Sequence, residues 1–224
     1  MNIRIIIMFI VAFVSLAAVS FFERQNYLLI SILFLSFVLI LYFVKFEKKA
    51  VSTRELVFIA IICALAVGGR IAFAELPSVK PELFILILGS MVAGSETGFL
   101  MGTIIALTSN MYFGQGAWTP WQMFSMGLIG LISGLISNHK INRYMLTLWG
   151  FLAGFLMGWI MDVYYILGFV SSINLQSIGL AFVGSFYFDL AHALFTAILL
   201  FIFGKPWSEK FNYYKKKYQL FMNE

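Results

Sequence analysis

Long apolar stretches separated by short polar connections constrain this chain more than any other feature. They cover residues 4–22, 27–44, 55–74, 81–94, 96–111, 120–137, 144–168 and 178–203. A membrane-spanning helix needs about 20 mostly apolar residues, and six of these stretches come close to or reach that length. Charged residues make up only 11% of the chain, against about 25% in a soluble domain. The sequence therefore predicts an all-α polytopic membrane protein.

Two of the stretches, 81–94 and 96–111, are short for full membrane spans. The residues Gly94-Ser95-Glu96 join them and leave room only for a tight turn. The pair is consistent with two spans or with a re-entrant hairpin, and both interpretations stay open at this point.

Basic residues are distributed unevenly between the two sides of the predicted bundle. With eight spans, both termini and the segments 45–54, 138–143 and 205–224 fall on one side, together with most of the Lys and Arg residues. Cytoplasmic loops carry the excess of Lys and Arg, so we expect this protein in the cell membrane with both termini cytoplasmic. Because the basic residues sit at helix ends, the net charge of +5 does not indicate nucleic-acid binding.

The chain divides at the charged segment 45–54. Residues 1–44 form two plain apolar helices, which we interpret as an accessory pair, and residues 45–54 form a basic cytoplasmic linker. Residues 55–204 contain six helices rich in glycine and polar residues, and we predict that this core carries the function. Residues 205–224 form a basic tail, expected to be interfacial or solvated.

An aromatic and amide-rich stretch, residues 111–126, connects two apolar segments. Glycines at 114 and 116 break a helix, and Pro120 suits the first turn of the next one. The stretch carries Tyr112, Gln115, Trp118, Trp121 and Gln122. It is either an interfacial aromatic belt or the wall of a ligand site, where aromatics give contact area and amides give orientation.

Ionisable residues inside apolar helices are costly and indicate a cavity or a partner. Arg70 and Asp162 lie near the outer ends of their helices, and a buried ion pair between them is one expectation. Asp189 and His192 share a helix face, which predicts an interhelical hydrogen-bond network. The same residues leave open a small intramembrane enzyme that uses Asp162, Asp189 and His192. They are too few for a metal site.

Small residues recur every four positions in several helices, which favours close helix packing in lipid. Ala60 and Ala64 differ from the rest because they follow the basic linker, in the cytoplasmic half of the first core helix. We predict that this smooth face docks another membrane subunit.

Three stretches resemble the substrate-binding S components of energy-coupling factor (ECF) vitamin importers. They are residues 69–81, residues 113–123 with the run Trp-Thr-Pro-Trp-Gln, and residues 188–193 with Phe-Asp-Leu-Ala-His-Ala. The Trp-Thr-Pro-Trp-Gln run is similar to the cobalamin-type subgroup. The family's common core has six helices, so the two helices in residues 1–44 are a departure from it.

The resemblance implies an S-component-like six-helix core that binds a vitamin from outside, with no cofactor of its own and no enzyme activity. Its partners would be membrane lipid, a transmembrane coupling protein that docks at Ala60 and Ala64, and two cytoplasmic ATPases. The best expectation for the ligand is cobalamin, and the alternatives are riboflavin, pantothenate or folate. A structural subunit without a ligand remains a third possibility. The predicted ligand contacts are Arg70, Lys80, Asn110, Tyr112, Gln115, Trp118, Trp121, Gln122, Asp162, Tyr165 and Asp189.

Overall fold

The computed structural model describes Ser36 and residues 51–137 and 142–221. The two helices predicted over 4–22 and 27–44, and most of the linker 45–54, lie outside the described residues. The described part is helical, with the helices α3 (Thr53–Ala72), α4 (Glu82–Ala93), α5 (Ser95–Phe113), α6 (Thr119–Ile136), α7 (Arg143–Phe169) and α8 (Leu175–Tyr218). The all-α prediction is confirmed, and these helices match the six stretches predicted for the core.

Helix α4 lies at the centre of the bundle and contacts α3, α5, α6, α7 and α8. Almost all of its residues are buried, including Glu82 in its first turn. With 12 residues it is about 18 Å long at 1.5 Å per residue, too short to cross a hydrocarbon core of about 30 Å. Among the described helices, α3, α6, α7 and α8 are long and apolar enough to span a membrane. We therefore describe α4 as a core helix that the surrounding helices enclose.

Small residues allow two pairs of helices to approach closely. A Cβ atom added to Gly98 of α5 would lie 2.4 Å from the carbonyl oxygen of Gly130 in α6. A Cβ atom on Gly154 of α7 would lie 2.4 Å from the backbone of Ala193 in α8. Real side chains do not fit at such distances, so these glycines set the spacing of the α5–α6 and α7–α8 pairs.

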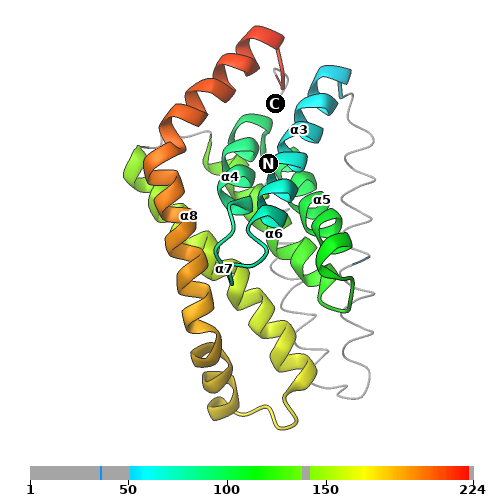
Figure 1. The fold of residues 1–224 in the computed structure, drawn as a ribbon, viewed down its shortest axis with the longest axis vertical. Coiled ribbons are helices and arrows are strands. Elements are labelled where there is room, and N and C mark those ends of the chain that lie inside the picture. Colours follow the sequence, from blue (N-terminus) through cyan, green and yellow to red (C-terminus); the bar gives the residue numbers. More distant parts are fainter. Residues whose placement is uncertain (1–35, 37–50, 138–141, 222–224) are drawn as a thin grey trace.

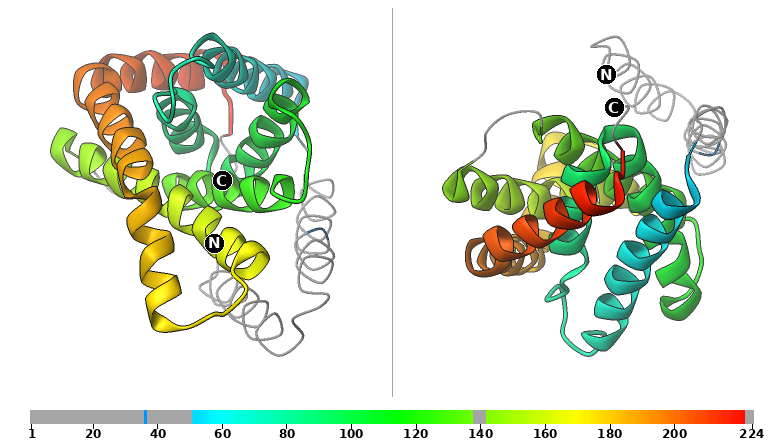
Figure 2. Two further views of the ribbon diagram at one scale, coloured as in Figure 1. Left: turned by 60° about the horizontal axis from the view of Figure 1, so that its bottom comes forward. Right: turned by 90° about the horizontal axis from the view of Figure 1, so that it is seen from above.

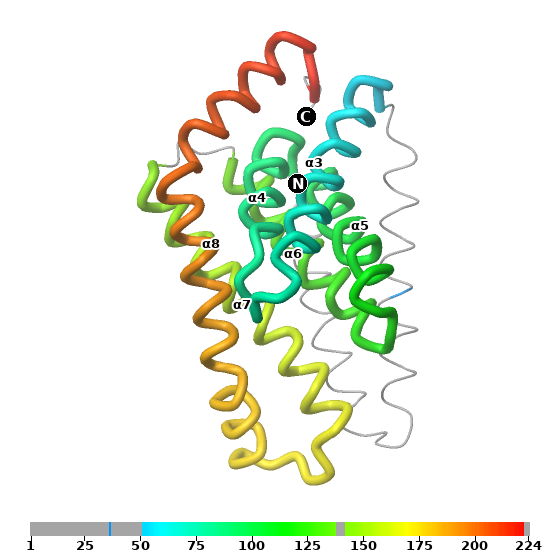
Figure 3. Tube along the Cα trace, viewed as in Figure 1, coloured from blue at the N-terminus to red at the C-terminus, as the bar shows by residue number. Residues whose placement is uncertain are grey.

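Helix α8 is longer than the apolar stretch 178–203 predicts. It continues past Pro206 to Tyr218, and it bends between its orange and red portions in Figure 3. Proline inside a helix removes a backbone hydrogen bond and causes such bends. The last part of α8 crosses the end of the bundle at which α3 begins, as Figures 1 and 2 show.

The C-terminal segment is packed onto this end of the bundle. Lys215 donates a hydrogen bond to the carbonyl oxygen of Val92 at 2.8 Å, and the backbone nitrogen of Phe221 donates to Glu55 at 2.6 Å. Leu220 and Phe221 are buried. Over its described residues, the segment that we expected to be an interfacial or solvated tail continues α8 and contacts the bundle at these points. Most of its other side chains are exposed, and the expectation stays a prediction.

The connections 73–81, 114–118 and 170–174 lie toward the opposite end of the bundle, and the α7–α8 pair reaches furthest (Figure 1). Arg54, Arg143 and the lysines of the last part of α8 lie at the end where α3 begins. These basic residues therefore gather at one end of the bundle, as the sequence predicts. Which end faces the cytoplasm stays a prediction.

Candidate functional site

Arg70 reaches the inside of the bundle from the last turn of α3. Its guanidinium donates through Nη1 to the hydroxyl of Ser109 and, at 3.5 Å, to the side-chain oxygen of Asn110. Its Nε lies 3.7 Å from Oε1 of Glu82. The residue is only 5% exposed, so its charge depends on these partners and not on water.

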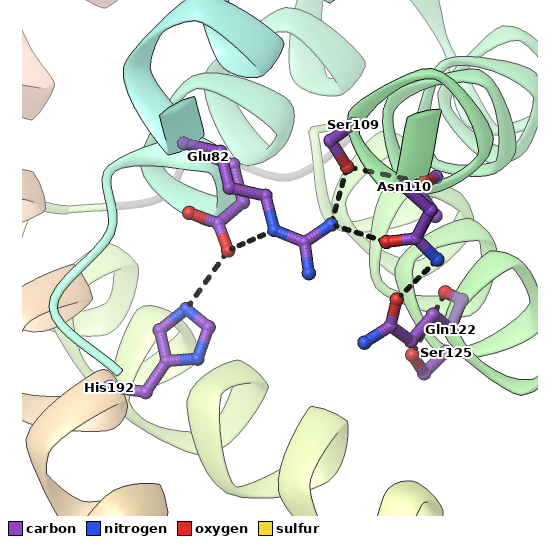
Figure 4. A network of polar contacts seen from close by, with 8 residues as sticks. Glu82, Ser109, Asn110, Gln122, Ser125 and His192 are labelled. Carbon is purple, nitrogen blue, oxygen red and sulfur yellow. Dashed lines mark hydrogen bonds and ion pairs between the residues drawn. The ribbon is translucent and has the colours of Figure 1, made fainter. Parts of the chain in front are cut away.

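Glu82 places one carboxylate between two basic groups from different helices. Besides Arg70 of α3, its Oε1 lies 3.7 Å from Nε2 of His192 in α8. Figure 4 shows the Glu82 carboxylate and the His192 ring turned toward each other. A carboxylate in the first turn of a helix is also stabilised by the helix dipole. The cluster therefore joins α3, α4 and α8 at one point.

The ion pair expected between Arg70 and Asp162 is not formed. Asp162 of α7 instead accepts a hydrogen bond from Ser185 of α8 at 2.8 Å. The same hydroxyl lies 2.9 Å from Asp189, so one serine bridges both carboxylates. Asp189 and His192 share a helix but have different partners, because Glu82 approaches His192 from α4.

A chain of side-chain hydrogen bonds continues from Arg70 to the aromatic stretch. The Asn110 nitrogen donates to Gln122 at 2.8 Å and to the Thr119 hydroxyl at 3.2 Å. Thr119 donates to Gln115 at 2.9 Å, and Gln115 donates to the backbone carbonyl of Leu107 at 3.0 Å. Gln115 therefore braces the loop with both ends of its amide, whereas Gln122 bonds to the described residues through its oxygen alone.

The predicted aromatic wall is divided between the core and the surface. Trp121 is fully buried, with its ring centroid 6.2 Å from that of Tyr164 in α7. Trp118 is partly exposed and its ring covers Gly116, while Tyr112 is largely exposed. Trp118 precedes α6 and belongs to the loop, whereas Trp121 lies within α6 and packs against Tyr164 of α7.

Lys80 and Arg70 both approach the ring of Phe113, at 4.8 Å and 5.1 Å from its centroid. Lys80 belongs to the connection between α3 and α4. Partial burial lowers the pKa of its amine, and the carboxylate of Glu82 offsets part of that shift. Two basic groups therefore lie beside one aromatic ring at this edge of the cluster.

A cavity of about 580 Å³ opens between α7 and α8, near the connection 170–174. Its lining includes Asp162, Tyr165, Ser177 and Ser185. Cavities that hold drug-sized ligands measure about 300–1,000 Å³. The structure thus brings Asp162 and Tyr165 to one cavity, close to Asp189, and groups Arg70, Asn110 and Gln122 in the separate polar cluster around Glu82.

Sequence reasoning missed several polar partners: Glu82, Ser109, Thr119 and Ser185. Glu82 had a usable signal, because it is a lone charge that follows Pro81 at the start of an otherwise apolar segment. The serines and the threonine had none, since such residues are common in membrane helices.

The face of α3 that carries Ala60 and Ala64 is exposed among the described residues. Gly68 continues this face, and nothing lies within 4 Å of a Cβ atom added there. Beside it, a groove of about 530 Å³ runs between α3 and the end of α8, with Val57, Ile61 and Tyr214 in its lining. The described residues thus leave a smooth apolar surface near the end of the bundle where α3 begins.

Comparison with known protein families identifies the family of this chain. Residues 50–208 match the family described as "ECF-type riboflavin transporter, S component", and this range covers well over half of the chain. The protein belongs to this family of S components. The matched range starts before α3 and includes all of α4 to α7 and most of α8, so the family core coincides with the bundle described above.

Curated relatives of this S component carry only the designation UPF0397. A UPF0397 protein of Vibrio atlanticus (strain LGP32) is 32% identical over 97 residues, which cover 41% of this chain and 53% of the relative. One from Aliivibrio fischeri (strain MJ11) is 33% identical over 97 residues, covering 41% and 52%. One from Aliivibrio salmonicida (strain LFI1238) is 34% identical over 89 residues, covering 38% and 48%. The chain spans about half the length of the curated relatives it matches. No solved structure matches the chain.

Proposed function

We propose that this S component is the membrane-embedded vitamin-binding subunit of an ECF-type importer, and that its ligand is a planar vitamin of the riboflavin class. The observation that carries the proposal is the family match over residues 50–208, because it covers the part of the chain that builds the polar cluster. This family is a class of transport component and not a class of enzyme.

The chemistry of the site supports a ligand of moderate size. The cavity between α7 and α8, lined by Asp162 and Tyr165, measures about 580 Å³. The polar cluster is separate from it and offers hydrogen-bond donors beside two basic groups. A corrinoid with its nucleotide loop is several times larger than a single tricyclic vitamin. Trp121, one of the aromatic residues predicted to wall a ligand site, packs in the core. Cobalamin therefore ranks second to a flavin.

Binding is tested with the purified protein in detergent. Riboflavin fluorescence should be quenched with saturation at one equivalent, while cobalamin, pantothenate and folate should fail to compete. The heat-unfolded protein serves as the control. If only cobalamin binds saturably, the ligand of this protein is cobalamin and not a flavin. If no vitamin of the panel binds, the vitamin-binding role is refuted.

The uncovered face of α3 supports docking of a transmembrane coupling protein, which would work with two cytoplasmic ATPases. We expect Ala60→Trp and Ala64→Trp to abolish riboflavin uptake in cells while the purified variants still bind riboflavin. The matched control is Leu152→Trp on an exposed side of α7. Full uptake by both alanine variants would remove the docking role from this face.

An enzyme that uses Asp162, Asp189 and His192 is a weaker alternative. Asp162 and Asp189 share the hydroxyl of Ser185, whereas His192 faces Glu82 on another helix. The three groups therefore do not converge on one reacting position. Under the enzyme alternative, Asp189→Asn should abolish turnover. Under the proposed function, it should weaken ligand binding or folding only.

A further inference from the structure

The hydrogen bonds that run from Arg70 to Gln122 have a fixed direction. A guanidinium carries only donors, so the Asn110 atom that Arg70 contacts must be its oxygen. The Asn110 nitrogen then points the other way and donates to Gln122 at 2.8 Å. The Gln122 atom that receives this bond must in turn be its oxygen. The orientation of both amides thus follows from Arg70.

This direction leaves the amide nitrogen of Gln122 without a partner among the described residues. In Figure 4 that nitrogen points away from Asn110, toward the side on which Glu82 and His192 lie. Gln122 is partly exposed, while Asn110 is almost completely buried. Rotating the Gln122 amide would set two NH₂ groups against each other in a buried place, so the alternative orientation is disfavoured.

The neighbouring amide does not offer a second free donor. Thr119 and the carbonyl of Leu107 occupy both ends of Gln115, as described above. The cluster also holds buried polar atoms without hydrogen bonds, namely Nε of Arg70, Oε2 of Glu82 and Nε2 of His192. Nε of Arg70 and Nε2 of His192 have only their 3.7 Å contacts with Glu82 among the described residues. Buried polar atoms without a hydrogen bond are costly, so a polar ligand that bonds them lowers the free energy.

We propose that Arg70, acting through Asn110, locks Gln122 as a hydrogen-bond donor and so makes the site selective for a ligand that presents an acceptor oxygen there. Gln122 is the specificity residue, and Arg70 and Asn110 are positioning residues. Resting on the proposed function, this assigns a ring carbonyl of a riboflavin-class vitamin to Gln122. A ligand with only donors at that position leaves the Gln122 nitrogen unpaired and binds more weakly.

The test compares riboflavin with 2-thioriboflavin and 4-thioriboflavin, in which sulfur, a weak acceptor, replaces one ring carbonyl oxygen. The wild-type protein should bind one of the two analogues about five- to tenfold more weakly than riboflavin, the effect of one lost hydrogen bond. Gln122→Met, of similar length but without the donor, should bind riboflavin and that analogue equally. Gln176→Met, at an exposed glutamine in the first turn of α8, is the matched control and should keep the discrimination.

A second variant tests the positioning role. Asn110→Asp still accepts from Arg70 but cannot donate to Gln122, which frees that amide to rotate. The discrimination should shrink while riboflavin binding persists, a result that a merely structural role would not give. If Gln122→Met does not fold, Gln122→Glu replaces it, because its carboxylate still accepts from Asn110 and offers no donor.

The outcomes separate this inference from the proposed function. If the wild-type protein does not bind riboflavin, the flavin proposal fails and the assignment of its carbonyl fails with it. If riboflavin binds and the Gln122 variant discriminates as the wild type does, the inference is overturned and the proposed function stands. Equal binding of all three flavins to the wild type also overturns it.

Discussion

Replacing Glu82 with glutamine tests whether one buried carboxylate holds three helices together. Glu82 is 1% exposed, and its Oε1 lies 3.7 Å from both Nε of Arg70 and Nε2 of His192. Glutamine keeps the shape of the side chain and removes its charge. The guanidinium of Arg70 then stays buried without a carboxylate, and α3 and α8 lose their common partner on α4.

The expected loss of stability follows from the burial of the pair. Removing one partner of a buried ion pair costs about 3–5 kcal/mol. We expect the lower end, about 3 kcal/mol, because Arg70 keeps its hydrogen bonds to Ser109 and Asn110. For a chain of this size, 1 kcal/mol shifts the Tm by about 2–4 °C. The Tm of Glu82→Gln should therefore fall by about 6–12 °C.

Thermal unfolding in detergent, followed by tryptophan fluorescence, measures this shift. Glu209→Gln is the matched control, because Glu209 pairs with Lys205 at 3.9 Å while both side chains are exposed. Exposed pairs contribute about 0–1 kcal/mol, so the control should stay within about 4 °C of the wild type.

A double replacement sharpens the test. Arg70→Met combined with Glu82→Leu removes both charges, and apolar pairs often match the stability of the buried ion pair they replace. The double variant should therefore recover most of the Tm that Glu82→Gln loses. A Glu82→Gln protein that unfolds within about 2 °C of the wild type would refute the assignment of Glu82 as the buried counter-charge.

Two further predictions use the same unfolding measurement. Gly98→Ala should lose about 1–3 kcal/mol, because its Cβ meets the Gly130 carbonyl oxygen at 2.4 Å, whereas Gly68→Ala, with open space around it, should be neutral or slightly stabilising. Equal effects at the two glycines would argue against the close α5–α6 contact. For Lys80, burial lowers the folded-state pKa below the ordinary 10.5, so the unfolded state binds more protons between the two values and stability rises with pH there. The Tm of the wild type minus that of Lys80→Met should therefore increase as the pH approaches 10.5. A difference in Tm that does not change with pH would contradict the lowered pKa of Lys80.

The helix positions were predictable because hydrophobicity along the chain reports them directly. The apolar stretches 55–74 and 120–137 correspond closely to α3 and α6. The break at Gly94 was also visible, and this residue has a positive φ of 87° that glycine adopts readily. Hydropathy did not predict the end of α8, since the lysines after residue 204 lower the hydropathy of a segment that is still helical.

The polar residues of the site were visible, but their pairing was not. Arg70 and Asp162 stood out as charges in apolar helices, and an ion pair between them was a reasonable expectation from their depth alone. The rotation of α3 and α4 about their axes decides instead that Arg70 meets Glu82. The packing of α6 against α7 likewise buries Trp121, while Trp118, which precedes α6, stays partly exposed.

The sequence by itself determined that this is a helical membrane protein and where the helices of its core lie. It also showed which residues carry charge at membrane depth. Each membrane-spanning segment must itself be apolar, so these features can be recognised segment by segment. The tertiary structure alone decided that α4 is enclosed and that Glu82 is the partner of Arg70. It also decided that the Gln122 nitrogen has no partner within the described part of the chain. These outcomes depend on contacts between helices far apart in the chain, and no local pattern of residues encodes the relative rotation that brings them together.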